Sequence, residues 1–260
     1  MSAAPNDALR EGEPVLLRRR AGDVHLTRLS SAPVTIEGVG VVDLAPVIGK
    51  PSGSAIDWAG RRSLVLRPTL SDLLGQLRRR AQIVTPKDAM FLLYLAGVGP
   101  GARVAEAGSG SGALTTVLAY AVGATGRVTS FDRREEFVKV ARSNVEQAGL
   151  ADRVEFRLRD VGSDGLDGGP YQSVVLDLAE PWTALPSARS ALEIGGHVAT
   201  YTPTYNQLER TVRALAESRF DEIRSVELLE RALHVGEGGT RPEFDMLGHT
   251  GFLTGARRVE

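Results

Sequence analysis

The spacing of hydrophobic and polar positions divides the chain into two regions. Between about residues 11 and 70, short apolar or alternating runs are separated by turns rich in glycine, proline and serine. This spacing predicts strands at PVLLRR, DVHLTRL, TIEGVGVVDL and RRSLVLRP, and it is typical of a small antiparallel barrel or sheet. We therefore expect a small β-domain over residues 1–68.

From TLSDLLGQLRRR onward, helical and strand patterns alternate. The sequence predicts helices at PKDAMFLLYLAGV, GALTTVLAYAV, REEFVKVARSNVEQAGL and YNQLERTVRALAES, and strands at RVAEAG, GRVTSFD, RVEFRLRD, QSVVLDL and GGHVATYTP. This alternation is typical of a parallel sheet with helices on both faces. FLTGARR follows a turn-rich stretch, so the last strand is expected to pair antiparallel with its neighbour. Residues 69–260 are predicted to form one α/β domain.

Composition mainly excludes possibilities. The 31 basic and 32 acidic residues nearly cancel, so a nucleic-acid partner would have to be met by a local patch. The chain has no cysteine, which excludes disulfides and thiolate zinc sites, and we expect no metal. The amino terminus lacks the apolar core of a signal peptide, and no run approaches the roughly 20 apolar residues of a membrane helix. We expect a cytoplasmic protein without membrane contact.

The glycine loop EAGSGSGALT joins a predicted strand to a predicted helix, which is where doubly wound sheets bind nucleotides. Gly108, Gly110 and Ala113 satisfy the dinucleotide pattern, with Asp132 at the ribose position. Glu106 would repel a pyrophosphate, whereas it would attract the ammonium and sulfonium of S-adenosylmethionine. The methyl donor fits better than a dinucleotide, and a dehydrogenase or a glycine turn that serves only packing are the alternatives.

Acids end the next predicted strands as well. Asp132 could accept both ribose hydroxyls, and Asp160, closing RVEFRLRD, could accept the adenine amino group. Asp177, in LDLAEPW, lies where the methyl group should emerge. A single acid at a strand end is often only solvated, but successive acids at one sheet edge favour a binding site.

Several motifs together resemble one family. RRRAQIVTPKDA, VAEAGSGSGALT, LDLAEPW, YTPTYNQ and LGHTGFLT are similar to the TrmI family of tRNA (adenine-N1-)-methyltransferases, which modify position fifty-eight of the T-loop. The resemblance implies a small amino-terminal β-domain, a seven-stranded class I methyltransferase domain with a Rossmann-like fold, and a homotetramer that binds tRNA across subunits. It also implies cofactor contacts at Ser111, Gly112, Ala113, Leu114, Asp132, Phe137, Asp160 and Asp177.

The expected chemistry needs alignment more than a base. The N-1 nitrogen of adenine has an in-plane lone pair, so no proton must leave before attack, and a carboxylate on the neighbouring amine would orient the ring. Asp177 is the candidate for this role, and Tyr201, at the end of GGHVATYTP, is expected to flank the base. Because the N-1 edge is used in pairing, the nucleotide is expected to flip into the pocket. Thr85 stands where the family often has an aromatic residue, which leaves open whether an adjacent adenine is also methylated.

A basic stretch joins the two regions. Arg78, Arg79, Arg80 and Lys87 are the candidates to contact RNA phosphates, although a charge run is often only a solvated helix face. Two alternatives to a tRNA methyltransferase stay open. The chain could methylate a small molecule or a protein, or it could be a non-catalytic tRNA-binding subunit, although the intact glycine loop and its acids argue against the latter.

Overall fold

Two compact units make up the chain in the computed structural model, which describes residues 8–260 apart from 21–22, 39, 59 and 80–81. The first unit comprises Met1–Arg78 and Ser143–Asp152, and the second comprises Arg79–Arg142 and Arg153–Glu260. Relative to the expected boundary between residues 68 and 69, the first unit also includes helix α1 (Leu70–Gly75) and residues 143–152.

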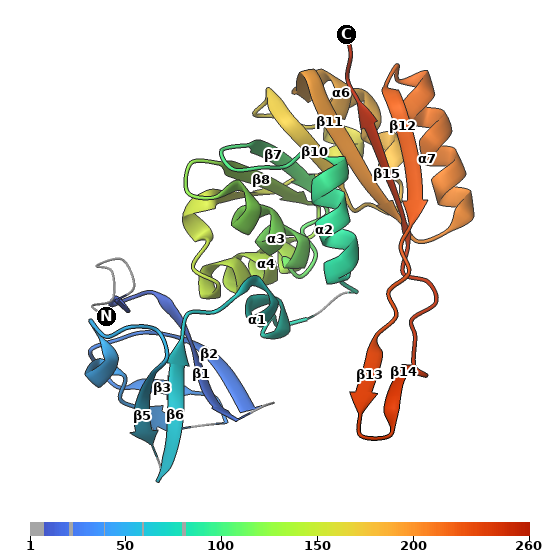
Figure 1. Cartoon of the computed structure of the whole chain (residues 1–260). Helices are drawn as coiled ribbons and strands as arrows, with labels where there is room; N and C mark the ends of the chain where they lie inside the picture. Colours follow the sequence, from blue (N-terminus) through green and yellow to red (C-terminus); the bar gives the residue numbers. More distant parts are fainter. Residues whose placement is uncertain (1–7, 21–22, 39, 59, 80–81) are drawn as a thin grey trace. The chain divides into compact units, whose positions relative to one another are not determined.

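The first unit is built on antiparallel strands (Figure 1). β1 lies between β2 and β6, β5 pairs with the other side of β6, and β3 and β4 form a separate ribbon. Among the described residues the four-stranded sheet keeps two free edges, so it is an open sheet and not a closed barrel. The strands and the short helix are β1 (Pro14–Arg20), β2 (Asp23–Arg28), β3 (Val34–Ile36), β4 (Gly40–Val42), η1 (Ala45–Val47), β5 (Ser54–Trp58) and β6 (Arg61–Leu66).

The apolar side chains predicted on these strands meet in one core. Val15 and Leu17 of β1 pack with Val65 of β6 and with Val42 and Leu44. The sequence analysis did not predict β5, because its SAIDW segment directly follows the turn residues GKPSG. Within β5 only Ile56 is fully buried, so the strand gives a weak hydrophobic signal.

Helix α1 begins at the cap that the sequence supplies. The Thr69 hydroxyl accepts a hydrogen bond from the Asp72 amide at 3.3 Å, and the Asp72 carboxylate accepts one from the Thr69 amide at 2.8 Å. This reciprocal pair is a capping box, which satisfies two amides at the helix start.

A seven-stranded sheet organises the second unit, in the order β12-β15-β11-β10-β7-β8-β9. The neighbours from β9 to β11 pair in parallel, whereas β15 pairs antiparallel with both β11 and β12. This confirms the predicted Rossmann-like sheet and its antiparallel last strand. The strands are β7 (Arg103–Ala107), β8 (Arg127–Asp132), β9 (Val154–Leu158), β10 (Tyr171–Leu176), β11 (Leu192–Thr202), β12 (Asp221–Glu227) and β15 (Phe252–Arg257).

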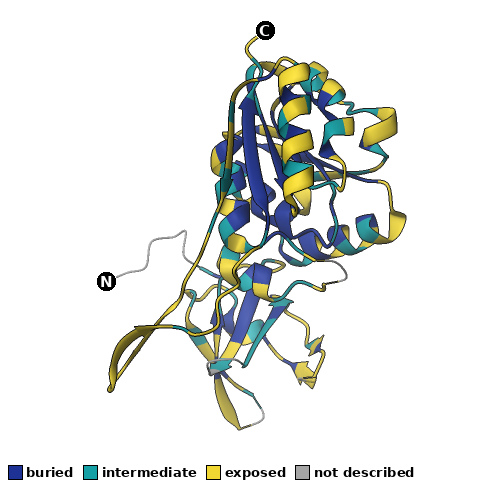
Figure 2. Cartoon of the chain, turned by 90° about the vertical axis from the view of Figure 1, so that its right-hand side faces the viewer, coloured by how far each residue is buried: buried dark blue, intermediate teal, exposed yellow. Residues whose placement is uncertain are grey.

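Helices flank this sheet, and its central strands are buried (Figure 2). Val174, Val175 and Leu176 of β10 have no exposed surface, as expected for a parallel strand covered on both faces. Strand order reverses between β7 and β10, which is where ligands bind in open α/β sheets. The helices are α2 (Pro86–Leu95), α3 (Ala113–Val122), α4 (Glu135–Gln147), η2 (Ala151–Arg153), α5 (Val161–Asp164), η3 (Pro181–Thr183), α6 (Leu185–Ala191) and α7 (Tyr205–Glu217).

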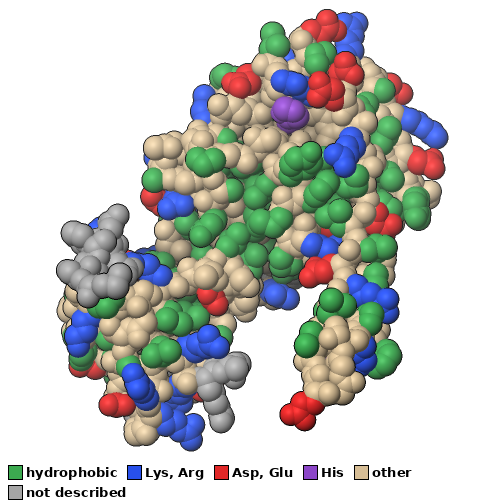
Figure 3. Space-filling view, viewed as in Figure 1, with side chains coloured by type: hydrophobic (Ala, Val, Ile, Leu, Met, Phe, Trp, Pro, Cys, Tyr) green, Lys and Arg blue, Asp and Glu red, His purple; other side chains and the backbone are tan. Residues whose placement is uncertain are grey.

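A hairpin extends from the sheet between β12 and β15. It contains β13 (Leu233–Gly236) and β14 (Gly239–Pro242), and we call residues 228–248 the arm. Hydrophobic side chains lie open on its surface (Figure 3), including Val235 at 74% and Phe244 at 83% exposure. The sequence predicts only turns in this stretch, because β13 and β14 are short and all their residues are exposed.

Candidate active site

The first turn after β7 packs directly against the end of β10. Gly108 has a φ of 99°, and a Cβ at this position would lie 2.0 Å from the carbonyl oxygen of Asp177. The Asp177 amide also donates to the carbonyl oxygen of Ala107 at 2.9 Å. Only glycine permits both this left-handed backbone and this close approach. The backbone of the glycine loop is therefore in direct contact with the end of β10, next to Asp177.

The other two glycines of the loop have different surroundings. Gly112, with a φ of 79°, packs against α4, where a Cβ would lie 2.9 Å from the Cα of Ala141. Gly110, with a φ of 50°, has no atom within 4 Å of a Cβ position, so it borders open space. Its amide donates to Oδ2 of Asp132 at 3.1 Å. The loop is thus closed against α4 and open beside the Asp132 carboxylate.

A pocket of about 360 Å³ lies at the carboxyl ends of β8, β9 and β10. Gly108, Asp132, Asp160 and Asp177 all line it, so the structure brings these four predicted residues together. Asp132 is buried, and its Oδ1 accepts a hydrogen bond from the Arg134 amide at 3.0 Å. Asp160 caps α5, with Oδ1 accepting from the Gly162 amide at 3.0 Å. The pocket wall is therefore rich in fixed carboxylates.

Asp177 changes its protonation state near neutral pH. Burial, and secondarily the charge of Asp132, raise the pKa of the Asp177 carboxyl to about 7. The position of the group explains this, because it lies at the base of a pocket shared with another acid. Its ionised form can accept hydrogen bonds from a ligand.

Glu106 does not lie where the sequence argument placed it. Its side chain is fully buried between β7, β8 and α3, where Oε2 accepts hydrogen bonds from the hydroxyls of Thr115 at 2.6 Å and Ser130 at 2.5 Å. Burial raises the pKa of Glu106 to about 8, so it is mostly uncharged at neutral pH. The expected attraction between Glu106 and a cationic cofactor does not arise in this geometry, because the carboxyl does not line the pocket. Any attraction of a cationic cofactor must therefore come from Asp132, Asp160 and Asp177, which do line the pocket.

The remaining predicted cofactor residues do not line the pocket. Phe137 lies beneath the guanidinium of Arg134, whose Cζ is 3.8 Å from the ring centroid. The residues that are absent from the pocket lining are Gly110, Ser111, Gly112, Ala113, Leu114 and Phe137. Their contacts with a cofactor stay predictions.

Three arginines that the sequence reasoning missed also line the pocket. Arg133 and Arg134 directly follow Asp132, and Arg159 directly precedes Asp160, so adjacency to the strand-end acids was the available signal. Arg134 Nε lies 3.5 Å from Asp132 Oδ1, and Arg133 Nη1 lies 3.5 Å from Asp160 Oδ2. Arg159 pairs with Asp167 at 3.1 Å. Each guanidinium therefore already has an acidic partner.

Tyr201 is the penultimate residue of β11, and it does not line the pocket. Its hydroxyl donates to the carbonyl oxygen of Thr250, and its ring packs so closely on Gly251 that a Cβ there would lie 2.4 Å from Cζ. Burial, with the charges of Asp88 and Asp177, raises the pKa of Tyr201 to about 12. The phenol thus stays neutral, which suits a wall of an acceptor pocket and excludes a base.

Lys87 is engaged inside the second unit, contrary to its predicted role as a phosphate contact. Its ammonium lies 2.7 Å from both Asp88 Oδ1 and Thr250 Oγ1, and only 15% of its side chain is exposed. Asp88 is fully buried and also accepts a hydrogen bond from the Thr85 hydroxyl at 2.8 Å. A buried carboxylate needs a paired cation, so Lys87 serves this ion pair.

The LDLAEPW loop is held by α7. Gln207 Nε2 donates to the Ala179 carbonyl oxygen at 2.9 Å, and the guanidinium of Arg210 lies 4.1 Å from the ring centroid of Trp182. Pro181 is buried at the start of η3. Trp182 is thus packed below Arg210, and Asp177 stands at the fixed end of this loop.

His249, which precedes β15, links the ends of β11 and β12. Its Nδ1 lies 2.6 Å from Glu227 Oε1 at the end of β12, and its Nε2 lies 2.7 Å from the carbonyl oxygen of Pro203, which follows β11. Both partners are acceptors, so both ring nitrogens donate when the imidazole is protonated. The hydrogen bonds that His249 donates to Glu227 and to the Pro203 carbonyl raise the pKa of His249 accordingly. Within the LGHTGFLT motif, His249 thus has a structural role in linking strands.

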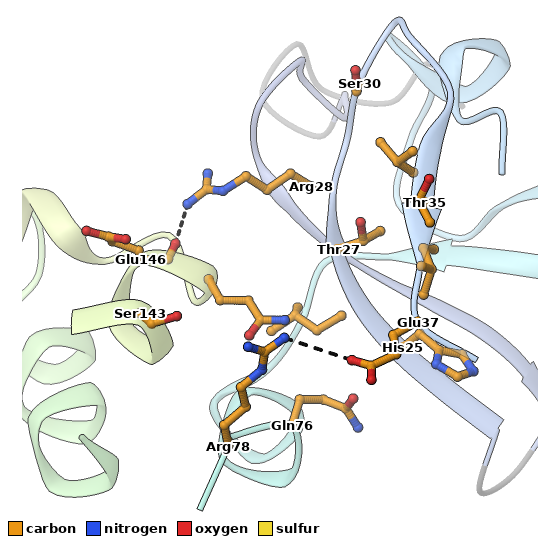
Figure 4. Close-up of a pocket in the computed structure, with 14 residues that line it drawn as sticks. His25, Thr27, Arg28, Ser30, Thr35, Glu37, Gln76, Arg78, Ser143 and Glu146 are labelled. Atoms are coloured by element: carbon orange, nitrogen blue, oxygen red, sulfur yellow. Dashed lines mark hydrogen bonds and ion pairs between the residues drawn. The ribbon is translucent and has the colours of Figure 1, made fainter. Parts of the chain in front are cut away.

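A larger hollow, of about 840 Å³, lies in the first unit (Figure 4). Arg78 faces Glu37 across it at 4.0 Å, and Arg28 donates to the backbone carbonyl of Glu146. Arg78 keeps 73% of its side chain exposed, and Arg79 is also exposed. Arg80, the remaining predicted RNA contact, lies outside the described residues. The hollow has balanced charges and no glycine loop, so the chemistry belongs to the pocket at the sheet edge.

S-adenosylmethionine fits the pocket by the chemistry of its walls. Asp132 and Asp160 offer acceptors for hydroxyl and amino groups, and Asp177 offers a carboxylate near a sulfonium. The open side of Gly110 leaves room next to Asp132. A pyrophosphate would meet four acidic side chains, those of Asp132, Asp160, Asp177 and Glu180, and the arginines that line the pocket are already paired, so it fits less well.

Two further searches concern the described part of the chain. No helix there is long and apolar enough to span a bilayer. No cluster of three or more His, Asp or Glu side chains with the arrangement of a metal site is found among the same residues.

Comparisons with known proteins identify a matching family model and several similar chains. The family model for the tRNA methyltransferase complex GCD14 subunit matches residues 63–239. A Methanocaldococcus jannaschii tRNA (adenine(57)-N(1)/adenine(58)-N(1))-methyltransferase TrmI is 36% identical, covering 76% of this chain and 79% of the relative. A Thermus thermophilus tRNA (adenine(58)-N(1))-methyltransferase TrmI is 35% identical, covering 94% and 96%. The crystal structure of a Thermotoga maritima SAM-dependent O-methyltransferase has a TM-score of 0.80 at 34% identity, covering 99% and 97%.

Proposed function

Because the chain belongs to the family of the tRNA methyltransferase complex GCD14 subunit, we propose that it methylates N-1 of adenine at position fifty-eight in the T-loop of tRNA. The observation that carries this proposal is the packing of Gly108 against the Asp177 carbonyl. This contact joins the proposed cofactor loop to Asp177, the carboxylate that we propose orients the acceptor.

S-adenosylmethionine is the proposed methyl donor, and it supplies an electrophilic methyl group when bound. Asp132 would accept hydrogen bonds from the ribose hydroxyls, and Asp160 would accept one from the adenine amino group. Gly110 leaves open space for the cofactor next to Asp132. The Thermotoga maritima structure, described as SAM-dependent, supports this donor on the same fold.

Asp177 would orient the target base. Its carboxylate accepts a hydrogen bond from the exocyclic amine of adenine and thereby aims the N-1 lone pair at the methyl carbon. The N–C bond forms as the S–C bond breaks, and the electron pair of the broken bond stays with sulfur. The product base carries a positive charge, which the Asp177 carboxylate stabilises. No proton needs to leave, so a residue with a pKa of about 7 serves as a carboxylate without acting as a strong base.

Tyr201 would form the wall beside the flipped adenine. Its hydroxyl is committed to the Thr250 carbonyl, so any contact with the base would be made by the ring and not by the hydroxyl. Thr85 cannot stack on a base, and its hydroxyl is committed to Asp88. The acceptor pocket is therefore less aromatic than an aromatic residue at position 85 would make it. Methylation of the adjacent position fifty-seven, as in the name of the Methanocaldococcus jannaschii relative, is the second outcome to test.

The tRNA would meet the exposed cations Arg78 and Arg79, with Arg80 as the third predicted contact. Lys87, the fourth predicted phosphate contact, is instead engaged in an ion pair with Asp88. We further propose that residues 69–260 act as the catalytic domain and that the enzyme works in the cytoplasm.

A homotetramer is the proposed assembly. The arm supports it, because Leu233, Val235, Phe244 and Leu247 are all more than 60% exposed, with values of 65, 74, 83 and 64%. An apolar hairpin of this kind gains from covering its side chains with another chain. Light scattering on the full chain measures the mass, and a monomer at micromolar concentration would contradict this assembly.

The function is tested by incubating the purified chain with methyl-labelled S-adenosylmethionine and unmodified tRNA, and then mapping the labelled nucleotide. We expect 1-methyladenosine at position fifty-eight. Label in protein or in a small molecule, with none in tRNA, would reject the proposal. A tRNA with guanine at that position is the matched control for the site of transfer.

A further inference from the structure

Tyr205 is an exposed aromatic residue at the edge of the sheet where the active site lies. It is the first residue of α7, three positions after β11 ends at Thr202, and 67% of it is exposed. An isolated exposed tyrosine needs no explanation. The surroundings of Tyr205 distinguish it from such a case.

The Tyr205 ring packs on other aromatic side chains that are themselves fixed in position. Its ring centroid lies 4.5 Å from that of Phe252, which is buried, and Phe252 lies 4.9 Å from the ring of His249. His249 is itself fixed by Glu227 and by the Pro203 carbonyl. We call Tyr205, Phe252 and His249 the aromatic ledge. One side of the Tyr205 ring is supported, and the rest faces solvent in a defined orientation.

The ledge is connected to the acceptor loop. Gln207, in the same first turn of α7, donates to the Ala179 carbonyl in the LDLAEPW loop, and Thr204 caps this turn by accepting from the Gln207 amide at 3.3 Å. Tyr205 is therefore positioned by the same helix start that positions the loop after Asp177. A polynucleotide whose target base enters the pocket passes this edge of the sheet.

The charges near the ledge are compatible with a nucleic acid. Glu227 is the acid that faces His249 within the ledge, and the two form an ion pair at 2.6 Å. Asp88, which also acts on His249, is paired with Lys87. Arg210 of α7 adds a guanidinium over Trp182. The two acids that act on His249, Glu227 and Asp88, are thus each paired with a basic side chain.

We propose that Tyr205, supported by Phe252 and His249, stacks on a nucleobase of the substrate RNA next to the flipped adenine. This inference rests on the proposed function. Stacking suits this position because every base has a π-face, and such a contact adds about 1–3 kcal/mol per base in single-stranded RNA recognition. Tyr205 would thereby supply aromatic contact that Thr85 does not supply inside the pocket.

The experiment compares Tyr205→Ala, Tyr205→Leu and Tyr205→Phe with a matched control, Tyr94→Ala. Tyr94 is 66% exposed and lies at the far end of α2 from its Thr85 cap. Measurements are the KM for unmodified tRNA, kcat, the Kd for S-adenosylmethionine, and the fluorescence of tRNA carrying 2-aminopurine beside the target adenine.

We expect Tyr205→Ala and Tyr205→Leu to raise the KM for tRNA roughly tenfold, as the loss of one stacked base predicts. The same variants should lose the quenching of 2-aminopurine on binding, while Tyr205→Phe and Tyr94→Ala keep both values. The Kd for S-adenosylmethionine should stay unchanged in all four. Tyr205→Leu keeps an apolar cover on Phe252, so it separates stacking from folding.

If the wild-type enzyme is active and Tyr205→Leu leaves both the KM for tRNA and the quenching unchanged, the stacking role of Tyr205 is rejected. The proposed function would not be affected. An equal rise in KM for Tyr94→Ala would also reject the stacking role, because the effect would then be unrelated to this edge. A wild-type enzyme that leaves tRNA unmethylated would instead reject the proposed function.

Discussion

The two sides of the active site are constructed differently. On the cofactor side, the loop from Gly108 to Gly112 and the acids Asp132 and Asp160 come from consecutive strand ends of one parallel sheet. On the proposed acceptor side, Tyr201, Lys87 and Thr250 come from segments up to 163 positions apart, and Lys87 and Tyr201 each donate a hydrogen bond to Thr250. The first side is specified by a local motif, and the second depends on tertiary contacts. Substitutions should therefore affect cofactor binding and tRNA methylation separately.

The largest effect is expected at the point where the two sides meet. Gly108→Ala would place a Cβ 2.0 Å from the Asp177 carbonyl oxygen in a left-handed backbone, so the loop or the strand end must move. We expect loss of S-adenosylmethionine binding and a drop in methylation on the order of 1000-fold, since misplacement by 1 Å alone can cost about 100-fold.

Calorimetric titration of the cofactor and a tRNA methylation assay measure the Gly108 effects. Gly99→Ala is the control, because a Cβ at Gly99 has no atom within 4 Å. Normal cofactor affinity in Gly108→Ala would show that the packing of Gly108 against Asp177 does not constrain the cofactor loop.

Asp177→Asn should separate cofactor binding from tRNA methylation more selectively than Gly108→Ala does. The amide keeps the shape but removes the charge that stabilises the methylated base, so kcat should fall roughly 100-fold. The exposed carboxylate variant Glu217→Gln is the control, and a kcat within about twofold of wild type for Asp177→Asn would contradict the orienting role.

The wild-type pH profile adds a test of the same residue. Because the pKa of Asp177 is about 7 and the ionised form is active, kcat/KM should rise with pH through about 7 and level off above it. This acid limb should be absent in Asp177→Asn. A limb that persists unchanged in the variant would assign the titration to another group.

Tyr201→Phe tests the acceptor side alone. It removes the hydrogen bond to the Thr250 carbonyl but keeps the ring, and one neutral hydrogen bond is worth about 1 kcal/mol. We expect a fall of roughly five- to tenfold in kcat/KM for tRNA with an unchanged Kd for S-adenosylmethionine. An equal loss of cofactor affinity would mean that the two sides are not independent.

Glu106→Gln should have the smallest effect on activity and a clear effect on stability. The pKa of Glu106 rises from 4.5 in the unfolded chain to about 8, so the folded protein binds the extra proton between these values. Its stabilising contribution is complete below pH 4.5 and declines, by about 1.4 kcal/mol per pH unit, as pH rises toward 8. Thermal unfolding from pH 5 to 9 should therefore show a flatter decline in the variant. An identical slope in both proteins would show that Glu106 is not buried as a protonated acid.

Predictability from sequence follows the same division. The parallel sheet, the antiparallel β15, the glycine turn and the three aspartates were predictable, because strand periodicity and strand-end position are local properties. The role of Glu106 was not, because its burial depends on Thr115 and Ser130 from other elements. Lys87 looked like a surface cation because nothing local shows that Asp88 is buried. The strands β5 and β13 were missed because short strands with little buried surface leave no periodic pattern.

The arm has one more consequence. The chain leaves the sheet after Glu227 and returns at His249, and these two side chains are hydrogen-bonded to each other. Everything between them is thus an insertion whose ends are already joined. Its length and sequence can vary in evolution, or be replaced by design, while the strands and Tyr201 keep their register. Assembly and catalysis can in this way diversify separately within one polypeptide.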